Sequence, residues 1–242
     1  MNQVQTQKAS SLHEATVCRD RLKHIIFNKS FQYSTQKEFK LSSGAYSHYY
    51  FNCKRTTLDP EGMHYIGHLF FERLHGQGIK GVGGLTLGAD PIANAVAIIS
   101  YQKGQPINPF VVRKELKDHG IINWIEGNVD PGDSVAIVDD VITTGNSTIQ
   151  AVQRATDSGL MVKKILILVD REEGGRNIFR NTHLIPRWRY YLLGQSLWNY
   201  TASKSRPGKA LMNKKELSYN EIEKLVRLCE SKINKGETCK HG

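Results

Sequence analysis

The chain has 242 residues, a length that fits one α/β domain with a buried core and modest additions. Hydrophobic residues make up 39% and charged residues 23%, an ordinary balance for a globular protein, and no apolar stretch has the length of a membrane span. The formal net charge of +10 suits polyanionic ligands, but half of this excess lies in residues 201–242, which carry ten Lys and Arg against five Glu.

The N-terminal stretch MNQVQTQKASSLHEATV is polar and lacks the apolar region of a signal peptide. Four cysteines are scattered along the chain without a CxxC pair, which fits reduced thiols. We therefore expect a cytoplasmic protein with no membrane partner.

The first half of the chain predicts a helix, a hairpin and a second helix. Residues 11–29 have a rough apolar face at helical spacing. The run FKLSSGAYSHYYFN, residues 39–52, mixes turn residues with β-favouring aromatics, which indicates a hairpin or hood-like element. Asp59 before Pro60 is a typical start signal, and the helix that follows should run to about Leu74.

From residue 79 onward, strands and helices alternate. We expect strands at 79–83, 109–113, 134–139 and 164–170 and helices at about 90–101 and 147–158. A last strand is expected at 188–193, a linker at 201–213 and an amphipathic helix at 216–233. This rhythm predicts an α/β fold whose central, mostly parallel sheet is flanked by helices.

The segment SVAIVDDVITTGNST, residues 134–148, carries the strongest chemical signal. An apolar strand ends in Asp139 and Asp140, and a loop from Thr143 to Ser147 opens a helix. Parallel sheets bind ligands at the carboxyl ends of their strands, and the free N–H groups at a helix start bind phosphate. Because the carboxylates can accept hydrogen bonds from ribose hydroxyls, these residues predict a ribose 5-phosphate site.

This segment resembles the phosphoribosyl pyrophosphate (PRPP) signature of type I phosphoribosyltransferases, which is a hydrophobic strand, two acids and a Thr/Gly loop. The segment GGLTLGADP, residues 83–91, matches the pyrophosphate loop of the same family. The resemblance implies PRPP binding by Val141, Ile142, Thr143, Thr144, Gly145, Asn146 and Ser147, and by Thr86, Leu87 and Gly88. A GxxxxGK[ST] P-loop is absent from the sequence, so a nucleotide triphosphatase is not expected.

Three more segments resemble the orotate phosphoribosyltransferases: the basic run VRKELKDHG at 112–120, the hood segment at 39–52, and VDREEGG at 169–175. By this resemblance the catalytic residues are Lys117, Asp139, Asp140, Arg113, Lys114 and His119. The residues implied for orotate are Ser43, Gly44, Tyr50, Phe51, Thr143 and Arg171. The implied reaction converts orotate and PRPP to orotidine 5′-phosphate and pyrophosphate, a step of de novo pyrimidine (UMP) biosynthesis.

The resemblance also implies a type I phosphoribosyltransferase fold, a homodimer and a need for Mg²⁺. The metal would be held through PRPP rather than directly by the protein, with Asp139 and Asp140 contacting it through water. We expect residues 1–52 to form an N-terminal helix and substrate-binding hood, residues 53–200 the PRPP-binding core, and residues 201–242 a basic linker and C-terminal helix.

The sequence departs from some family members at Ser42, Ala45 and Leu87, where those members carry basic residues. Two alternatives remain at this point. The first is a phosphoribosyltransferase specific for another base, because the loop at 143–147 would serve it equally well. The second is a non-catalytic regulator that keeps the PRPP fold and binds nucleic acid through its basic tail.

Overall fold

The computed structural model describes residues 16–34, 36, 39–40, 44, 46–47, 49–115 and 123–171. Residues 16–25 form an α-helix that continues as the π-helix η1 (Ile26–Ser30), so the helix predicted at 11–29 is confirmed over its described part. The predicted strand at 188–193, the linker and the helix at 216–233 lie outside the described residues.

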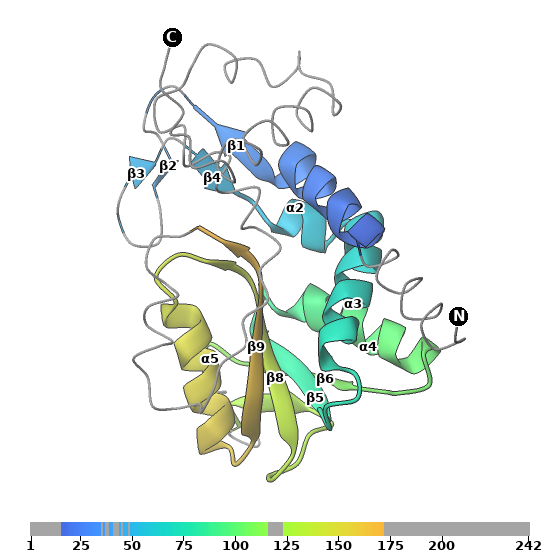
Figure 1. Ribbon diagram of the computed structural model, residues 1–242. Coiled ribbons are helices and arrows are strands. Elements are labelled where there is room, and N and C mark those ends of the chain that lie inside the picture. Colours follow the sequence, from blue (N-terminus) through green and yellow to red (C-terminus); the bar gives the residue numbers. More distant parts are fainter. Residues whose placement is uncertain are drawn as a thin grey trace, which may run out of the picture.

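A small hood follows this helix. Strand β1 (Phe31–Tyr33) pairs antiparallel with β4 (Tyr49–Phe51), and β2 (Phe39–Lys40) pairs antiparallel with β3 (Tyr46–Ser47). The aromatic rings of Phe31 and Phe51 lie opposite each other with centroids 5.2 Å apart, which ties the first and last strands of the hood. The hood lies beyond the carboxyl ends of the main sheet (Figure 1) and confirms the hairpin prediction.

The main sheet has five strands in the order β7-β6-β5-β8-β9. The strands are β5 (Gly81–Leu85), β6 (Asn108–Val112), β7 (Ile125–Gly127), β8 (Ser134–Ile142) and β9 (Met161–Asp170). All neighbouring pairs are parallel except β6 with β7. The predicted α/β class with a mostly parallel sheet is therefore confirmed.

Helices cover both faces of the sheet (Figure 1). The helices after the hood are α2 (Lys54–Thr57), α3 (Pro60–Leu74), α4 (Asp90–Gln102) and α5 (Asn146–Asp157). Alternate side chains of β8 separate the two faces: Ala136 and Val138 pack with α3 and α4, whereas Val135 and Ile137 pack with α5. This period of two is what a strand buried on both sides requires.

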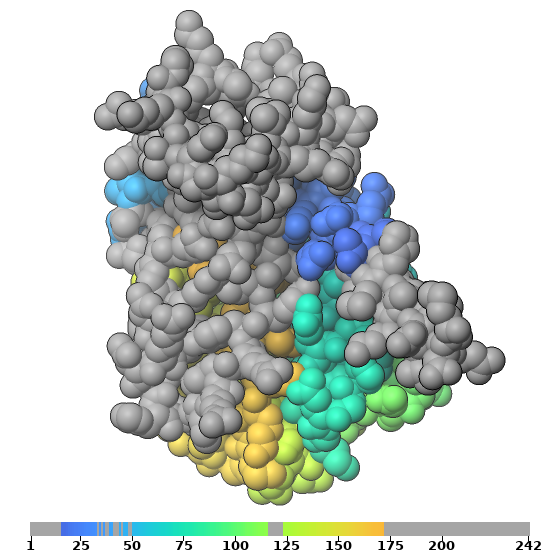
Figure 2. Space-filling view, viewed as in Figure 1, coloured from blue at the N-terminus to red at the C-terminus, as the bar shows by residue number. Residues whose placement is uncertain are grey.

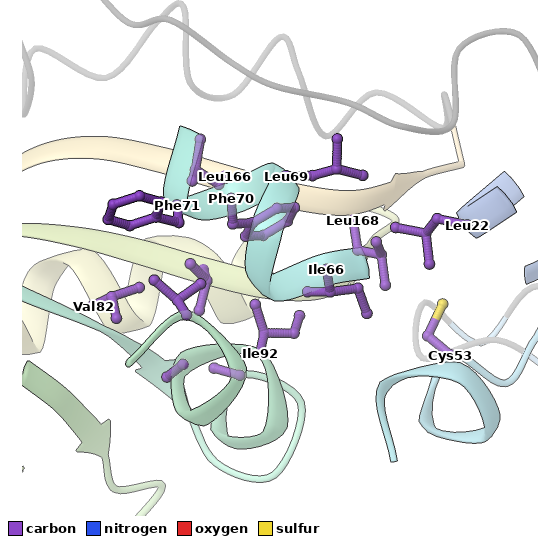
Figure 3. Close-up of a cluster of buried hydrophobic side chains, with 14 of the residues drawn as sticks. Leu22, Cys53, Ile66, Leu69, Phe70, Phe71, Val82, Ile92, Leu166 and Leu168 are labelled. Carbon is purple, nitrogen blue, oxygen red and sulfur yellow. The ribbon is translucent and has the colours of Figure 1, made fainter. Parts of the chain in front are cut away.

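The larger core joins the sheet to α3, α4 and the N-terminal helix. Figure 3 shows Phe70 of α3 and Ile92 of α4 among the apolar side chains of this cluster, with Leu22 at its edge. Figure 2 shows the N-terminal helix in contact with α3, where Arg21 forms a 2.7 Å ion pair with Glu61. The N-terminal helix, and with it Phe31 and Phe51 of the hood, is anchored to the core through apolar packing, which contributes roughly 25 cal/mol for each Å² of apolar surface buried.

Strand β5 begins and ends two residues later than predicted, because Gly83 and Gly84 lie inside it and not in the loop. A Cβ atom on Gly83 would lie 2.1 Å from the carbonyl oxygen of Phe110, and one on Gly84 would lie 2.2 Å from that of Val138. Both glycines are therefore needed for close packing within the sheet, and the loop itself is limited to 86–89.

The short strand β7 was not predicted, because three residues are too few to show an alternating pattern. It pairs antiparallel with β6 and closes the edge of the sheet beside the basic run. Among the described residues, no helix is both long enough and apolar enough to cross a membrane.

Candidate active site

The site is built around the end of β8 and the start of α5. Asp139 and Asp140 are only 7% and 6% exposed, although both are carboxylic acids. The Oδ1 atom of Asp139 accepts a 3.0 Å hydrogen bond from the backbone N–H of Asp140, and its Oδ2 accepts one of 2.8 Å from the hydroxyl of Thr148. Gly145 precedes α5 in the left-handed conformation with φ 90°, which turns the chain sharply into the helix.

Burial disfavours the ionised forms of both acids, and the charge of Asp140 adds to this effect at Asp139. Burial, followed by the charge of Asp140, raises the pKa of Asp139 to about 7. Burial also raises the pKa of Asp140, while the ammonium of Lys54, with Nζ 4.0 Å from Oδ2 of Asp140, opposes that shift. A perturbed acidic pair at the end of a buried parallel strand is characteristic of a functional site.

A first cavity of about 240 Å³ opens beside the acids. It is lined by Lys54, Leu85, Thr86, Leu87, Gly88, Lys114, Asp139, Asp140, Val141, Ile142, Thr143, Thr144, Gly145, Asn146, Ser147 and Thr148. The loop after β5 forms one wall, and the hydroxyl of Thr86 donates a 2.6 Å hydrogen bond to Asp90 at the start of α4. This loop approaches the acids so closely that a Cβ on Gly88 would lie 2.8 Å from Oδ1 of Asp140.

A second cavity, also of about 240 Å³, lies between the hood and the core. It is lined by Lys40, Tyr50, Phe51, Asn52, Cys53, Lys54, Asp140, Val141, Thr143 and Arg171. The two cavities share four lining residues: Lys54, Asp140, Val141 and Thr143. Ligands in the two cavities would therefore meet at the acidic pair.

The structure brings together most of the predicted site. All ten residues expected to bind PRPP line the first cavity, together with Asp139, Asp140 and Lys114 of the catalytic set. Tyr50, Phe51, Thr143 and Arg171 of the orotate set line the second cavity. Ser43, Lys117 and His119 lie outside the described residues.

Two predicted residues are placed elsewhere. Gly44 is exposed, has φ 84°, and is not part of the lining of either cavity. Arg113 also lines neither cavity, because its guanidinium lies 3.5 Å from Glu126 on β7 and its backbone N–H bonds to the carbonyl of Trp124. Arg113 thus anchors the base of the basic run in this conformation.

Arg171 is almost fully buried, with 2% of its surface exposed. Its Nη2 atom lies 3.5 Å from the hydroxyl of Ser47 in β3, and its backbone N–H bonds to the carbonyl of Ile142. The guanidinium therefore reaches from the end of β9 toward the hood. A buried guanidinium lining a cavity suits a planar carboxylate, which it can bind through two parallel hydrogen bonds.

Sequence reasoning missed four residues of the second cavity: Lys40, Asn52, Cys53 and Lys54. Lys40 and Asn52 lie inside the hood segment at 39–52, whereas the signal for Lys54 was the basic pair that follows YYFNC, and basic residues after a strand are common on protein surfaces. Cys53 is buried, and burial, followed by the charge of Asp140, raises the pKa of its thiol well above the ordinary value. Cys53 therefore serves as an inert wall of the cavity.

The donor set suits a magnesium ion held mainly by a ligand. Within the described ranges, no group of three or more His, Cys, Asp or Glu side chains is arranged to hold a metal. The protein instead offers the oxygens of Asp139 and Asp140, and Mg²⁺ commonly binds one or two carboxylates together with substrate phosphates and water.

No protein-family model matches the chain. The chain is 47% identical over 158 residues to the orotate phosphoribosyltransferase of Aquifex aeolicus, an alignment that covers 65% of this chain and 86% of the relative. It is 43% identical over 171 residues to that of Rhodopseudomonas palustris, covering 69% of this chain and 89% of the relative. Among solved structures, Mycobacterium tuberculosis orotate phosphoribosyltransferase in complex with PRPP has a TM-score of 0.57 and 35% identity, covering 72% of this chain and 95% of that chain.

The mostly parallel sheet with an acidic pair before the start of a helix, covered by a separate hood, and the likeness to the Mycobacterium tuberculosis structure define the type I phosphoribosyltransferase class. Within that class, the chain belongs to the orotate phosphoribosyltransferase family, because it is more than 40% identical to curated members of that family and its alignment covers most of their length. The predictions of fold, family and a phosphoribosyl-transferring enzyme are confirmed.

Proposed function

We propose that this protein transfers the phosphoribosyl group of PRPP to orotate, giving orotidine 5′-phosphate and pyrophosphate. The observation that carries the proposal is the pair of adjoining cavities that share Asp140 and Thr143. One cavity offers backbone amides and hydroxyls to a phosphate, and the other offers Arg171 to a carboxylate. A sugar phosphate and an acidic base would then meet at the shared wall.

The first cavity suits PRPP, which the Mycobacterium tuberculosis relative binds. The helix start from Gly145 to Ser147 would receive the 5-phosphate, and Asp139 and Asp140 would accept hydrogen bonds from the ribose hydroxyls. Thr86, Leu87 and Gly88 would face the pyrophosphate, whose departure Lys114 would favour by its positive charge. We assign Lys117 and His119, which lie beyond the described residues, to the same task.

The second cavity suits orotate. Arg171 would pair with the orotate carboxylate. Tyr50 also lines this cavity, and its ring, which stacks on Phe39 with centroids 6.0 Å apart, would lie against the pyrimidine ring. Phe51 contributes to the same wall from the core, because it is 3% exposed and packs on Phe31. Lys40 adds a further positive charge to this cavity.

In the reaction, the bond from ribose C1 to the pyrophosphate oxygen breaks, the bond from C1 to a ring nitrogen of orotate forms, and the proton of that nitrogen passes to the departing pyrophosphate. Positive charge develops at C1 in the transition state, as in glycoside transfer, and the buried carboxylates favour it. Holding both substrates at the shared wall supplies much of the rate enhancement. Mg²⁺ would neutralise charge on the pyrophosphate, with Asp139 and Asp140 contacting it through water.

We further propose a cytoplasmic homodimer, as expected from the sequence resemblance. In that family the basic run reaches the neighbouring subunit's site, which would place Lys117 of each chain across the dimer. Mixing a Lys117→Ala chain with a chain inactivated at Asp140 tests this arrangement. Recovered activity in the mixture supports shared sites, and an inactive mixture of two folded variants contradicts them.

The proposed reaction is tested by incubating the protein with PRPP, Mg²⁺ and either orotate, uracil, hypoxanthine or adenine, and identifying the products by mass. Formation of orotidine 5′-phosphate with equimolar pyrophosphate, and no nucleotide from the other bases, is the expected result. A purine nucleotide as the main product would instead establish a different base specificity.

A further inference from the structure

Lys114 reaches the first cavity from the base of the basic run. It follows the end of β6 at Val112 by two residues, is exposed, and lines that cavity. A lysine carries its ammonium on a long, flexible chain, so the charge is placed only as well as the backbone that bears it. The contacts of the preceding residue, Arg113, therefore decide where the ammonium of Lys114 can act.

The peptide group that joins Arg113 to Lys114 is held by two other segments of the chain. Its carbonyl oxygen, that of Arg113, accepts a hydrogen bond from the guanidinium of Arg154 on α5. The backbone N–H of Arg113 donates a 2.9 Å hydrogen bond to the carbonyl of Trp124, just before β7. Because a peptide group is planar, fixing its carbonyl oxygen also fixes the direction in which the chain enters Lys114.

Arg154 is in turn held in place by Trp124. Its guanidinium lies 3.8 Å from the centroid of the Trp124 ring while it donates to the carbonyl of Arg113. The flat face of a guanidinium can stack on an aromatic ring while its N–H groups donate in the plane, and an ammonium cannot do both in this way. The side chain is half-buried, so both contacts are partly shielded from water.

The helix that carries Arg154 also forms part of the first cavity. The residues from Gly145 to Thr148, at the start of α5, line the cavity, and Arg154 lies in the last turn of the same helix. At a rise of about 1.5 Å per residue, Arg154 is roughly 12 Å along the axis from Asn146. One rigid helix therefore links a wall of the cavity to the segment that presents Lys114.

We propose that Arg154, stacked on Trp124, is a positioning residue for Lys114: it holds the peptide between Arg113 and Lys114 so that the Lys114 ammonium faces an anion in the first cavity. This inference rests on the proposed function for the identity of that anion, the pyrophosphate group. Loss of Arg154 should therefore weaken pyrophosphate binding only as long as Lys114 is present.

The test is a double-mutant cycle read by calorimetric binding of inorganic pyrophosphate with Mg²⁺, without any base. We expect affinity about tenfold below wild type in Lys114→Met and about fivefold below it in Arg154→Met. The double variant should bind within about twofold of Lys114→Met alone, because Arg154 then has no ammonium to position. Gln153→Met is the matched control at an exposed neighbour on α5 and should stay within about twofold of wild type.

Arg154→Lys separates the geometry of this contact from its charge. The variant keeps the positive charge but loses the planar donor, so we expect pyrophosphate affinity about threefold below wild type. Wild-type affinity in Arg154→Lys would overturn the inference, because a positive charge near the site would then be sufficient.

Two further outcomes of the cycle would contradict the role of Arg154. One is unchanged pyrophosphate affinity in Arg154→Met or in Lys114→Met. The other is a double variant whose loss is the product of the two single losses, as expected if Arg154 only stabilises the fold. Orotate turnover by wild type keeps the claims separate: turnover with independent losses rejects the positioning role alone, whereas the expected cycle without orotate turnover rejects only the base.

Discussion

The hydroxyl of Thr148, in the first turn of α5, donates a 2.8 Å hydrogen bond to Oδ2 of Asp139 near the end of β8. This contact spans the loop that forms one wall of the first cavity. It favours the ionised form of Asp139, although burial and the charge of Asp140 dominate and keep its pKa high. The strand and the helix on either side of the loop are therefore joined through one side-chain contact beside the first cavity.

Replacing Thr148 by Val tests this contact, because Val has nearly the same shape without the donor. Loss of the hydrogen bond disfavours the ionised Asp139, so we expect PRPP affinity about five- to tenfold lower, measured by calorimetry near neutral pH. Thr148→Ser keeps the hydroxyl and serves as the control. Wild-type affinity in the Val variant would show that the contact has no part in ligand binding.

Asp139→Asn should stabilise the free protein and weaken its function. The folded state raises the pKa of Asp139 to about 7, so folding favours the protonated carboxyl group. The contribution of Asp139 to the free energy of unfolding is therefore complete below the pKa of the unfolded chain and is lost as pH rises through the pKa of the folded protein. The Asn variant escapes this loss. We expect its melting temperature to exceed that of wild type by roughly 3 °C or more at about pH 8, and this difference to shrink toward about pH 5.

The same variant should bind PRPP at least about tenfold more weakly, since the ionised acceptor is lost. Asp157→Asn is the matched control, because Asp157 lies at the far end of α5 and accepts a 2.8 Å hydrogen bond from exposed Gln153. A lower melting temperature for Asp139→Asn than for wild type at both pH values would contradict the electrostatic account of the acidic pair.

Gly145→Ala should damage stability and phosphate binding together. The φ of 90° disfavours a residue with a Cβ by about 1–2 kcal/mol, and relaxing it would move the amides at the start of α5. Gly132, with φ 92° in the turn before β8 and so at the other end of that strand, is the matched control. Both Ala variants should melt a few degrees lower, roughly 2–6 °C, but only Gly145→Ala should raise the KM for PRPP. Equal KM values in the two variants would argue against a phosphate at this helix start.

Arg154 fixes the last turn of α5 to the edge of the sheet. Its guanidinium lies 3.8 Å from the centroid of the Trp124 ring and donates a hydrogen bond to the carbonyl of Arg113. Arg154→Met should lower the melting temperature by roughly 3–6 °C, since a cation–π contact and a charged hydrogen bond are lost. Gln153→Met, a change at an exposed neighbour, should shift it by no more than about 1 °C. A similar shift in both variants would mean that Arg154 contributes no specific contact.

Local pattern was sufficient for the part of the site that lies on one continuous segment. The strand, acid pair, loop and helix of residues 134–157 follow each other in sequence, so this wall of the first cavity could be predicted from one segment and its resemblance to the family signature. The place of Lys54 in the site could not be predicted, because it depends on how α2 is held between η1 and α3. Arg113 was assigned to the site by resemblance, but Glu126 on the unpredicted strand β7 competes for its guanidinium.

The central claim is that the cavity lined by Arg171 receives the base, while the neighbouring cavity receives the sugar phosphate. The most direct measurement is a comparison of the KM for orotate and the Kd for PRPP in wild type and Arg171→Gln. Because a buried charge-assisted pair with the carboxylate is lost, we predict a KM for orotate at least about 30-fold higher, with a Kd for PRPP within about threefold of wild type. An unchanged KM for orotate, or an equal loss of PRPP affinity in a variant that remains folded, would contradict the division of the site.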